Sequence, residues 1–253
     1  MMKNPMFRRR GAAGVALFAA LSTSALATGM VPETSVVLLN EADGETTMNV
    51  KNSDATPQLL YSSVNHIDED QEDLVVVTPP VARVEANETQ VVRFLLRSKT
   101  PLKTERLARA VFEGIPPKDT KPGEARVTMT VRQDLPLVIH PKGLPLEREP
   151  WKLLKVAVTG SELVVTNDSP YVVRLAQNVQ FQPGGQTAEL PRPYVLPKTT
   201  VKVDLGGGVK EGSKDAPKVA PAAAASLRLF PATLYGFAVE SYDVPLTTPQ
   251  AAK

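Results

Sequence analysis

Few residues of this chain have the types and spacing that chemical catalysis requires. The 253-residue sequence contains no cysteine and only two histidines, His66 and His140. Thiol catalysis, thiolate zinc sites and most histidine-based chemistry are therefore excluded. The sequence also lacks a Gly-x-Ser-x-Gly elbow, a phosphate-binding loop and a His-Glu-x-x-His motif. We expect neither an enzymatic activity nor a cofactor.

An acidic cluster at residues 68–73 is the main candidate for a metal site, because calcium favours several oxygen ligands. The cluster lacks the spaced ligands and the turn glycine of a calcium-binding loop. Blocks of like charge usually face water. We therefore expect a solvated hairpin tip without a metal ion.

A regular alternation of side chains begins after residue 125. Val127, Met129 and Val131 lie two residues apart and would share one face of a strand. The strand could pack this face on its own core, or it could be an open edge whose apolar side chains fill a groove in a partner. Pro136 cannot donate to a strand ladder, which favours an edge or a strand end. The opposite face carries Arg126, Thr128, Thr130 and Arg132.

The elements that would position these residues are strands. Short runs rich in Val, Leu and Thr recur about every ten residues and are separated by Gly, Pro, Asn and Asp, which predicts an all-β fold of sandwich type. No amphipathic helix pattern of 12 or more residues interrupts the runs. The predicted strands are 35–39, 46–51, 59–64, 74–77, 90–96, 107–113, 126–139, 153–158, 162–166, 171–179, 200–205, 226–230 and 234–242.

A proline-rich joint divides the strands into two series of domain size. It lies at residues 141–145 and predicts a boundary between Ile139 and Trp151. We expect a first domain at 28–141, a linker at 142–150, a second domain at 151–247 and a tail at 248–253. The low-complexity segment 206–225 predicts a mobile loop within the second domain.

The N-terminal 27 residues have the features of a secretory signal. Lys3 and Arg8–Arg10 precede an apolar run that is too short to span a bilayer, and Ala25-Leu26-Ala27 resembles a cleavage site. This segment carries four of the 29 Lys and Arg and none of the 27 Asp and Glu, so the remainder has a net charge of 25 − 27 = −2. That balance does not favour nucleic-acid binding. A soluble exported protein without membrane insertion is expected.

Three local strings, in this order, resemble the periplasmic pilus chaperones of the chaperone and usher pathway. They are Thr78-Pro79-Pro80-Val81-Ala82-Arg83, then Glu105 with the strand after it and Ile115-Pro116-Pro117, and then Asn167-Asp168-Ser169-Pro170-Tyr171. The resemblance implies two immunoglobulin-like β-sandwiches set at an angle around a cleft. It also implies a periplasmic location, pilus subunits and an outer-membrane usher as partners, no cofactor, and the possibility that free copies cap one another as a dimer.

The same resemblance implies roles for particular residues. In this family the last strand of the first domain completes a subunit that lacks one strand, and Val127, Met129 and Val131 align with the donor positions. Arg83, Glu105 and His140 align with an interdomain ion network whose third member is usually an arginine. A histidine is charged only part of the time at neutral pH, so we expect a weaker network.

One departure from the family concerns the arginine and lysine that usually hold the client's terminal carboxylate. Ser35 and Pro136 stand near the places where these basic residues are expected. Arg132 and Ser35 are therefore the sequence-based candidates for a carboxylate anchor, although Arg132 lies about 13 Å before Pro136 along an extended strand. The alternative function is a secreted adhesive or carbohydrate-binding β-sandwich, against which the low aromatic content argues mildly.

Overall fold

The computed structural model describes residues 29–117, 130–208 and 223–247. Several predicted features therefore lie outside the described residues: the secretory signal at 1–27, the donor residues Val127 and Met129, positions 209–222 of the predicted mobile loop, and the tail at 248–253. No helix in the described part of the chain has the length and apolar character needed to cross a membrane.

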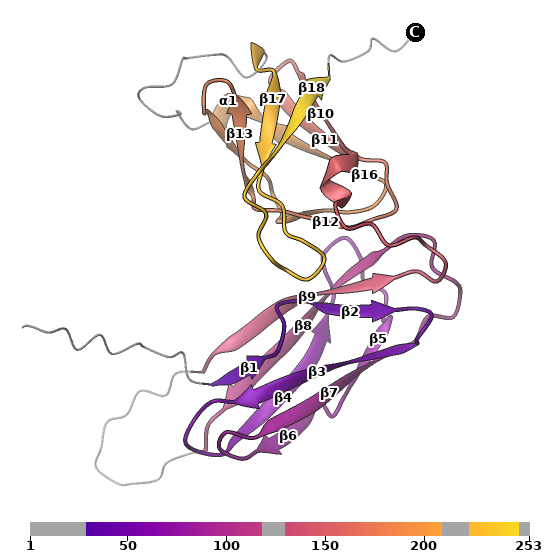
Figure 1. The fold of residues 1–253 in the computed structure, drawn as a ribbon, viewed down its shortest axis with the longest axis vertical. Coiled ribbons are helices and arrows are strands. Elements are labelled where there is room, and N and C mark those ends of the chain that lie inside the picture. The colour runs from indigo at the N-terminus through magenta and orange to yellow at the C-terminus, as the bar shows by residue number, and fades with distance from the viewer. Residues whose placement is uncertain (1–28, 118–129, 209–222, 248–253) are drawn as a thin grey trace, which may run out of the picture.

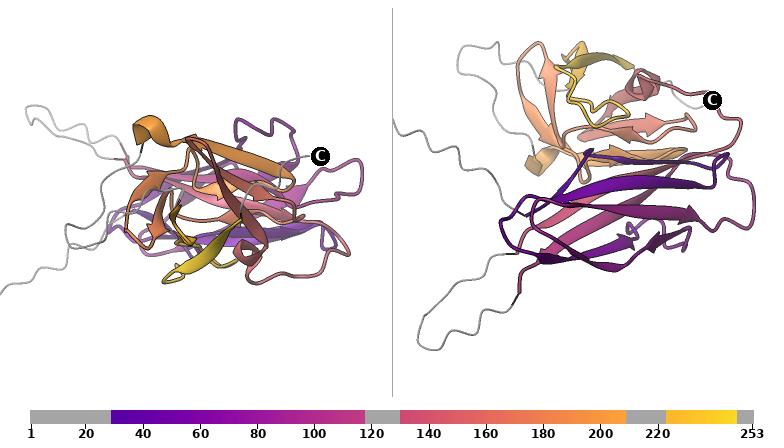
Figure 2. Two further views of the ribbon diagram at one scale, coloured as in Figure 1. Left: turned by 90° about the horizontal axis from the view of Figure 1, so that it is seen from above. Right: turned by 60° about the horizontal axis from the view of Figure 1, so that its bottom comes forward.

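The N-terminal half of the described chain forms two sheets (Figure 1). A four-stranded sheet has the order β1-β3-β7-β5, and a five-stranded sheet has the order β2-β9-β8-β4-β6. The turned view in Figure 2 shows these long strands in layers beneath the second domain. The strands are β1 (Met30–Pro32), β2 (Val37–Asn40), β3 (Glu45–Asn52), β4 (Gln58–Asn65), β5 (Val75–Thr78), β6 (Val81–Val84), β7 (Thr89–Leu96), β8 (Arg106–Ile115) and β9 (Arg132–His140).

The second domain begins with a short 3-10 helix, η1 (Pro150–Leu153), whose Trp151 is buried. A seven-stranded sheet has the order β14-β13-β17-β18-β10-β11-β16, and β12 pairs with β15 in a separate ladder. The elements are β10 (Leu154–Thr159), β11 (Glu162–Asn167), β12 (Val173–Arg174), β13 (Asn178–Gln182), β14 (Thr187–Glu189), β15 (Tyr194–Val195), β16 (Thr199–Asp204), α1 (Leu205–Gly208), β17 (Ser226–Leu229) and β18 (Tyr242–Thr247).

Each domain is built around its own apolar core. In β3, Met48 and Val50 are buried whereas the residues beside them are exposed, which is the period-two pattern of a strand with one face inward. Phe94 and Phe112 meet edge to face in the first core, with ring centroids 6.2 Å apart. Neither domain contains a disulfide in its described residues, so apolar burial is the main source of stability.

The prediction of a strand at residues 234–242 is wrong. The structure has a loop there, and only Tyr242 begins a strand, β18. Gly236 has a φ of +87°, and its N–H donates to the Thr233 carbonyl, so the chain turns instead of extending. Residues 206–208 of the predicted mobile loop belong to the single helical turn α1.

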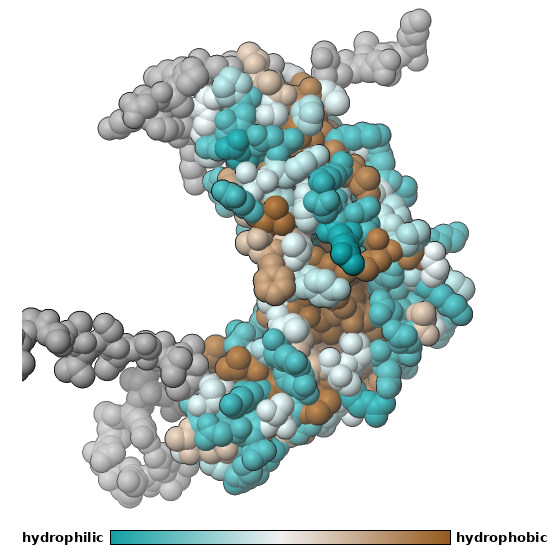
Figure 3. All heavy atoms as spheres, viewed as in Figure 1, coloured by the Kyte–Doolittle hydropathy of each residue, from teal (hydrophilic) through white to brown (hydrophobic). Residues whose placement is uncertain are grey.

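A smaller third cluster of buried residues joins the two domains. Val36, Leu107 and Val138 of the first domain pack with Val172 and Tyr194 of the second. The two domains meet at an angle and leave a concave waist, around which hydrophobic surface gathers in Figure 3. The proline-rich joint at residues 141–145 lies in the connection between β9 and η1.

Candidate functional site

The strand β9 has two edges with different surroundings. Along one edge it pairs with β8 over its length, from Arg132 opposite Glu113 to Ile139 opposite Arg106. Along the other edge β2 pairs with only the last four residues, from Leu137 to His140. Among the described residues no strand pairs with this second edge at positions 132–136. This part of β9 is therefore an open edge with unpaired backbone groups.

The predicted donor residue Val131 stands just before β9 and is 47% exposed. An exposed side chain of this size contributes little to the core of its own domain. Val131 therefore leaves apolar surface open to solvent. It is available to a partner at the start of the open edge.

The two candidate anchor residues are not brought together. Arg132 is exposed at the first position of β9. Ser35 lies before β2, and the parallel register of β2 with β9 would place it level with Leu135, about 10 Å along the strand from Arg132. The Ser35 hydroxyl instead approaches the carbonyl oxygen of Tyr235 in the second domain, at 3.5 Å.

Pro136 lies within β9, opposite Arg109 of β8, and is the last residue before β2 begins to pair. Because β9 continues to His140, Pro136 does not end the strand. A proline without an N–H is tolerated here because it is at an edge. The expectation that Pro136 marks an exposed edge agrees with this placement.

An open cavity of about 360 Å³ lies between the domains at this point of β9. Pro136 and Arg109 line it from the first domain, and Arg174 and Tyr194 from the second. Most of the remaining wall is apolar, which strengthens electrostatic interactions inside the cavity. Sequence reasoning missed Arg109 and Arg174, because no motif distinguishes them from the other basic residues of the strands.

Glu105 and His140, two of the three residues predicted to form an interdomain ion network, contact each other within the first domain. Glu105 is 4% exposed, and its Oε1 lies 2.9 Å from His140 Nδ1. Its Oε2 accepts a hydrogen bond from the Val172 N–H at 2.8 Å, which joins the two domains directly. The third expected member, Arg83, does not take part. Arg83 lies in the edge strand β6 and pairs there with Glu85 at 2.7 Å, because β6 is at the far side of the sheet from β9.

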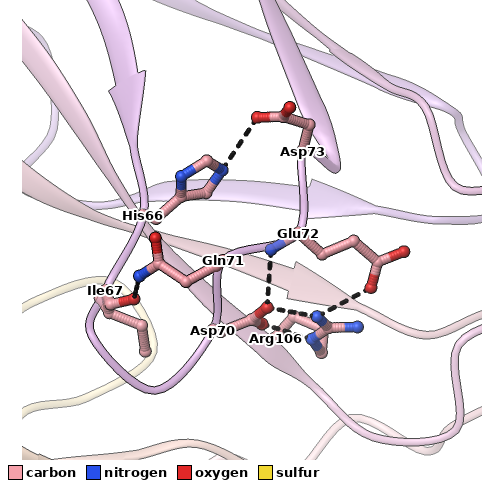
Figure 4. A network of polar contacts seen from close by, with 7 residues as sticks. All are labelled: His66, Ile67, Asp70, Gln71, Glu72, Asp73 and Arg106. Carbon is pink, nitrogen blue, oxygen red and sulfur yellow. Dashed lines mark hydrogen bonds and ion pairs between the residues drawn. The ribbon is translucent and has the colours of Figure 1, made fainter.

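Most of the acidic cluster faces solvent, as expected, but several of its side chains are engaged in ion pairs and hydrogen bonds (Figure 4). Asp70 is only 17% exposed and forms an ion pair with Arg106, which also contacts Glu72 at 3.1 Å. The neighbouring Asp68 pairs with Arg192 of the second domain, and Tyr194 donates to Glu69 at 3.0 Å. The cluster thus braces the interdomain contact. Within the described residues no group of three acidic, His or Cys side chains is arranged to hold a metal.

Burial and charge perturb the pKa values of two residues at this contact. Burial raises the pKa of Tyr194, and its hydrogen bond to Glu69 raises it further, to about 12. Burial also lowers the pKa of Arg174, because a charged group loses solvation in the cavity wall. The field of the Glu105 carboxylate opposes this effect and raises the pKa of Arg174.

Two family models match the chain. The model described as "Pili and flagellar-assembly chaperone, PapD N-terminal domain" matches residues 29–145, and "Pili assembly chaperone PapD, C-terminal domain" matches residues 149–221. The uncharacterised fimbrial chaperone YhcA of Escherichia coli K12 is 41% identical over 231 residues, which are 91% of this chain and 96% of YhcA.

Solved structures with the same fold include a chain from the complex of the Salmonella enterica SafA pilin with the SafB chaperone. The TM-score is 0.69 at 20% identity, and the match covers 87% of this chain and 97% of that one. The Escherichia coli chaperone DraB gives a TM-score of 0.66 at 21% identity, with 87% and 98% of the two chains covered. These structures support the two-sandwich fold.

Proposed function

The chain belongs to the pilus-assembly chaperone family, which is not enzymatic, and on this premise we propose that it holds pilus subunits by lending them a strand. The donated element is the open edge of β9 with the residues just before it, Val127, Met129 and Val131. The protein acts in the periplasm and delivers its clients to an outer-membrane usher.

The observation that supports this proposal most directly is the incomplete cover of β9. A strand with one free edge can accept a further strand through main-chain hydrogen bonds, the known mode of chaperone and pilin pairing. Here β2 covers only the last four residues of β9, so positions 132–136 offer room for a client strand. The match to a chaperone from a complex with a pilin agrees with a client of this kind.

The side chains around the edge suit a binding role better than a structural one. Val131 is 47% exposed, so its burial in a client would remove apolar surface from water without disturbing the chaperone's own core. A charge at this position would be buried without a partner in the complex, which costs several kcal/mol. Binding and folding should therefore respond differently to substitution of Val131.

The test is Val131→Glu, measured as capture of a co-expressed pilus subunit and as thermal stability of the free protein. We expect the free variant to melt within a few degrees of the wild type and to lose at least about tenfold in captured subunit. Val91→Glu is the matched control, because Val91 is 46% exposed but lies in β7, away from β9. That variant should capture the subunit normally.

Two results would contradict the proposal. Normal capture by a folded Val131→Glu variant would place the client elsewhere. Equal loss of capture by the Val91→Glu variant would show that the effect reflects general damage to the fold and not the open edge.

A further inference from the structure

We propose that the loop between β17 and β18 makes a second contact with the pilus subunit, through an aromatic pair formed by Tyr235 and Phe237. This contact takes a large apolar side chain from the folded body of the subunit, beside the strand that pairs with β9. The inference rests on the proposed function, because both contacts serve the same client, and it extends the interface to the second domain.

The aromatic pair is unusually exposed. Phe237 is 72% and Tyr235 is 60% exposed, more than any other large hydrophobic residue in the described part of the chain. An aromatic side chain removes roughly 150–250 Å² from water when it is fully covered, so the pair leaves about 250 Å² exposed. Neighbouring apolar side chains that stay in water in this way mark an interaction surface, unlike single ones.

The backbone of the loop holds the aromatic pair in place. The Thr233 N–H donates to the Phe237 carbonyl oxygen, and the Gly236 N–H donates to the Thr233 carbonyl oxygen, both at 2.8 Å. Arg174 donates to the carbonyl oxygens of Thr233 and Leu234, the latter at 3.0 Å. A loop that is already fixed loses little conformational freedom when it binds, so this turn is preorganised to present its side chains.

Alternate residues of the loop face two different spaces. Gly236 and Ala238 line the cavity between the domains. Tyr235 and Phe237 instead line an open hollow of about 440 Å³. The loop is therefore a wall between the cavity and the hollow. In Figure 1 this loop, drawn in yellow, reaches from the second domain toward β2 and β9 at the concave waist.

The loop also touches the segment that precedes β2, where the open edge of β9 ends. The Tyr235 carbonyl oxygen lies 3.5 Å from the Ser35 hydroxyl. Gly236 packs against both Ser35 and Val36. The open edge extends as far as Pro136, which lines the same interdomain cavity as the loop. The body of a client that pairs with β9 is therefore brought against the loop.

The lining of the hollow indicates what it binds. Trp151, Leu234 and Val239 add apolar surface beside the aromatic pair. Arg148 and Glu149 have opposite charges, so together they give the hollow no net charge that would attract an ion. Aromatic rings pack favourably against a further ring, and the centre of a protein interface is enriched in such side chains. The hollow therefore suits a large apolar side chain of the subunit.

The first experiment measures capture of a co-expressed pilus subunit by Tyr235→Ala, Phe237→Ala and the double variant. The free variants should melt within a few degrees of the wild type, because substitutions of exposed side chains change stability little. We expect each single variant to capture roughly three- to tenfold less subunit, and the double variant roughly ten- to a hundredfold less, since these rings become buried only in the complex.

Tyr61→Ala is the matched control for the aromatic pair. Tyr61 is an aromatic residue that is 40% exposed, and it lies in β4, which β8 separates from β9. This variant should capture the subunit as the wild type does.

A cross-linking measurement tests the contact without removing the ring. A photoreactive phenylalanine derivative is incorporated in place of Phe237, and the complex with the subunit is irradiated. Position 237 should become joined to the subunit, whereas the same derivative in place of Tyr61 should give no such product. A product that contains two chaperone chains, with no mixed product in the presence of the subunit, would show that the loop binds a second copy instead.

The outcomes separate this inference from the proposed function. If Val131→Glu loses capture while the folded double variant captures normally, the donated strand stands and the second contact is overturned. The second contact also fails if position 237 gives no cross-link to a captured subunit, or if Tyr61→Ala loses as much capture as the double variant. Normal capture by Val131→Glu contradicts the proposed function itself.

Discussion

Glu105 shows how a single buried side chain connects separate parts of this molecule. One oxygen faces His140 at the end of β9, the other accepts from Val172 in the second domain, and the Glu105 N–H donates to the Pro170 carbonyl. A buried carboxylate is tolerated only when hydrogen bonds replace water. All three contacts lie at the base of the interdomain waist, so this residue holds the domains beside the cavity.

Asp70 allows a prediction about acid sensitivity. Burial alone would raise its pKa, but hydrogen bonds from Arg106 and from the Glu72 N–H outweigh burial and hold that pKa below its usual value. The pair therefore stabilises the protein fully above the unfolded-state pKa of about 3.9 and loses its contribution as the pH falls through the lowered value. Asp70→Asn should lower the free energy of unfolding by about 1–3 kcal/mol at pH 7.

Urea unfolding of the wild type and of Asp70→Asn, repeated from pH 7 down to about pH 3, would measure this difference. The stability difference between the two proteins should narrow as the pH falls from about 3.9 through the lowered folded-state pKa of Asp70, because the unfolded wild-type chain then binds a proton before the folded one does. Asp73→Asn is the control in the same hairpin, because the Asp73 side chain is 90% exposed, and it should change stability by less than about 0.5 kcal/mol. If the difference in unfolding free energy between the wild type and Asp70→Asn stays constant with pH, the ion pair of Asp70 with Arg106 is not its cause.

The sequence supported some of these residue-level assignments and not others. Glu105 and His140 were named together because their places in the strands matched a known pattern. Arg83 was named on the same ground, but its partner Glu85 is only two residues away, just after the end of the same edge strand. Arg174 gave no signal, because its burial in the wall of the interdomain cavity is apparent only in the folded chain.

At the scale of elements, β9 divides into two parts with different tasks. Leu137 and Ile139 are buried in the core of the first domain, and β2 covers this part. Residues 132–136 have β8 on one side only. The covered part fixes the strand in the sandwich, and this support holds the open part in an extended conformation before any client arrives.

Amide hydrogen exchange should reveal this division. Among residues 132–135, the N–H groups that point away from β8 have no strand to bond with and should exchange rapidly in the free protein, whereas those at 137–140 should be protected. A bound pilus subunit should slow exchange in the open part. Residues 109–113 of β8, paired with strands on both sides, are the internal control and should not change.

Exchange that is already slow at residues 132–135 in the free monomer would mean that the edge is covered within the molecule. If a subunit binds and these amides remain fast, the client contacts another element.

The strand pattern was predictable where apolar and polar residues alternate clearly, as in β3, β4 and β7. The sequence missed the short strands β6, β14 and β15, since two to four residues give too little periodicity. The loop that begins at Thr233 was mistaken for a strand because Leu234, Tyr235 and Phe237 are typical strand residues. Tyr235 and Phe237 are in fact exposed, and Gly236 turns the chain between them.

At the scale of the whole molecule, the angle between the domains depends on contacts made by loops. The loop around Gly236 touches the segment before β2, so a side chain at Gly236 would overlap Ser35 Oγ and lie 2.9 Å from Val36 Cγ2. Val36 is buried and has little freedom to move. This close approach limits how far the waist can close.

Gly236→Ala should therefore loosen the interdomain contact. At Gly236 both the positive φ and the overlap disfavour an alanine. Gly143→Ala is the control: Gly143 also has a positive φ, +82°, but a Cβ added there would have no atom within 4 Å. We expect Gly236→Ala to cost about 1–3 kcal/mol more than Gly143→Ala, the usual range for overpacking. Chemical denaturation gives the two costs, and small-angle scattering should show a wider domain angle only for Gly236→Ala.

Equal costs for the two variants, with unchanged scattering, would show that the loop yields without moving the domains.

The overall two-domain plan was evident from strand spacing and from the resemblance to pilus chaperones, and membership in that family now displaces the adhesive alternative. The domain contact was not evident, because it joins Asp68 and Glu69 to Arg192, which lies far from them in the sequence.

The open edge of β9 also bears on whether copies of the free protein associate with one another. Identical strands that stack in parallel register, as in amyloid fibrils, place each side chain against its own copy. In β9 this would set Arg132 against Arg132 and Asp134 against Asp134, and like charges in such positions repel. Pro136 would also leave a gap in every ladder. The edge is thus open to a foreign strand while fibrillar growth on copies of itself is disfavoured.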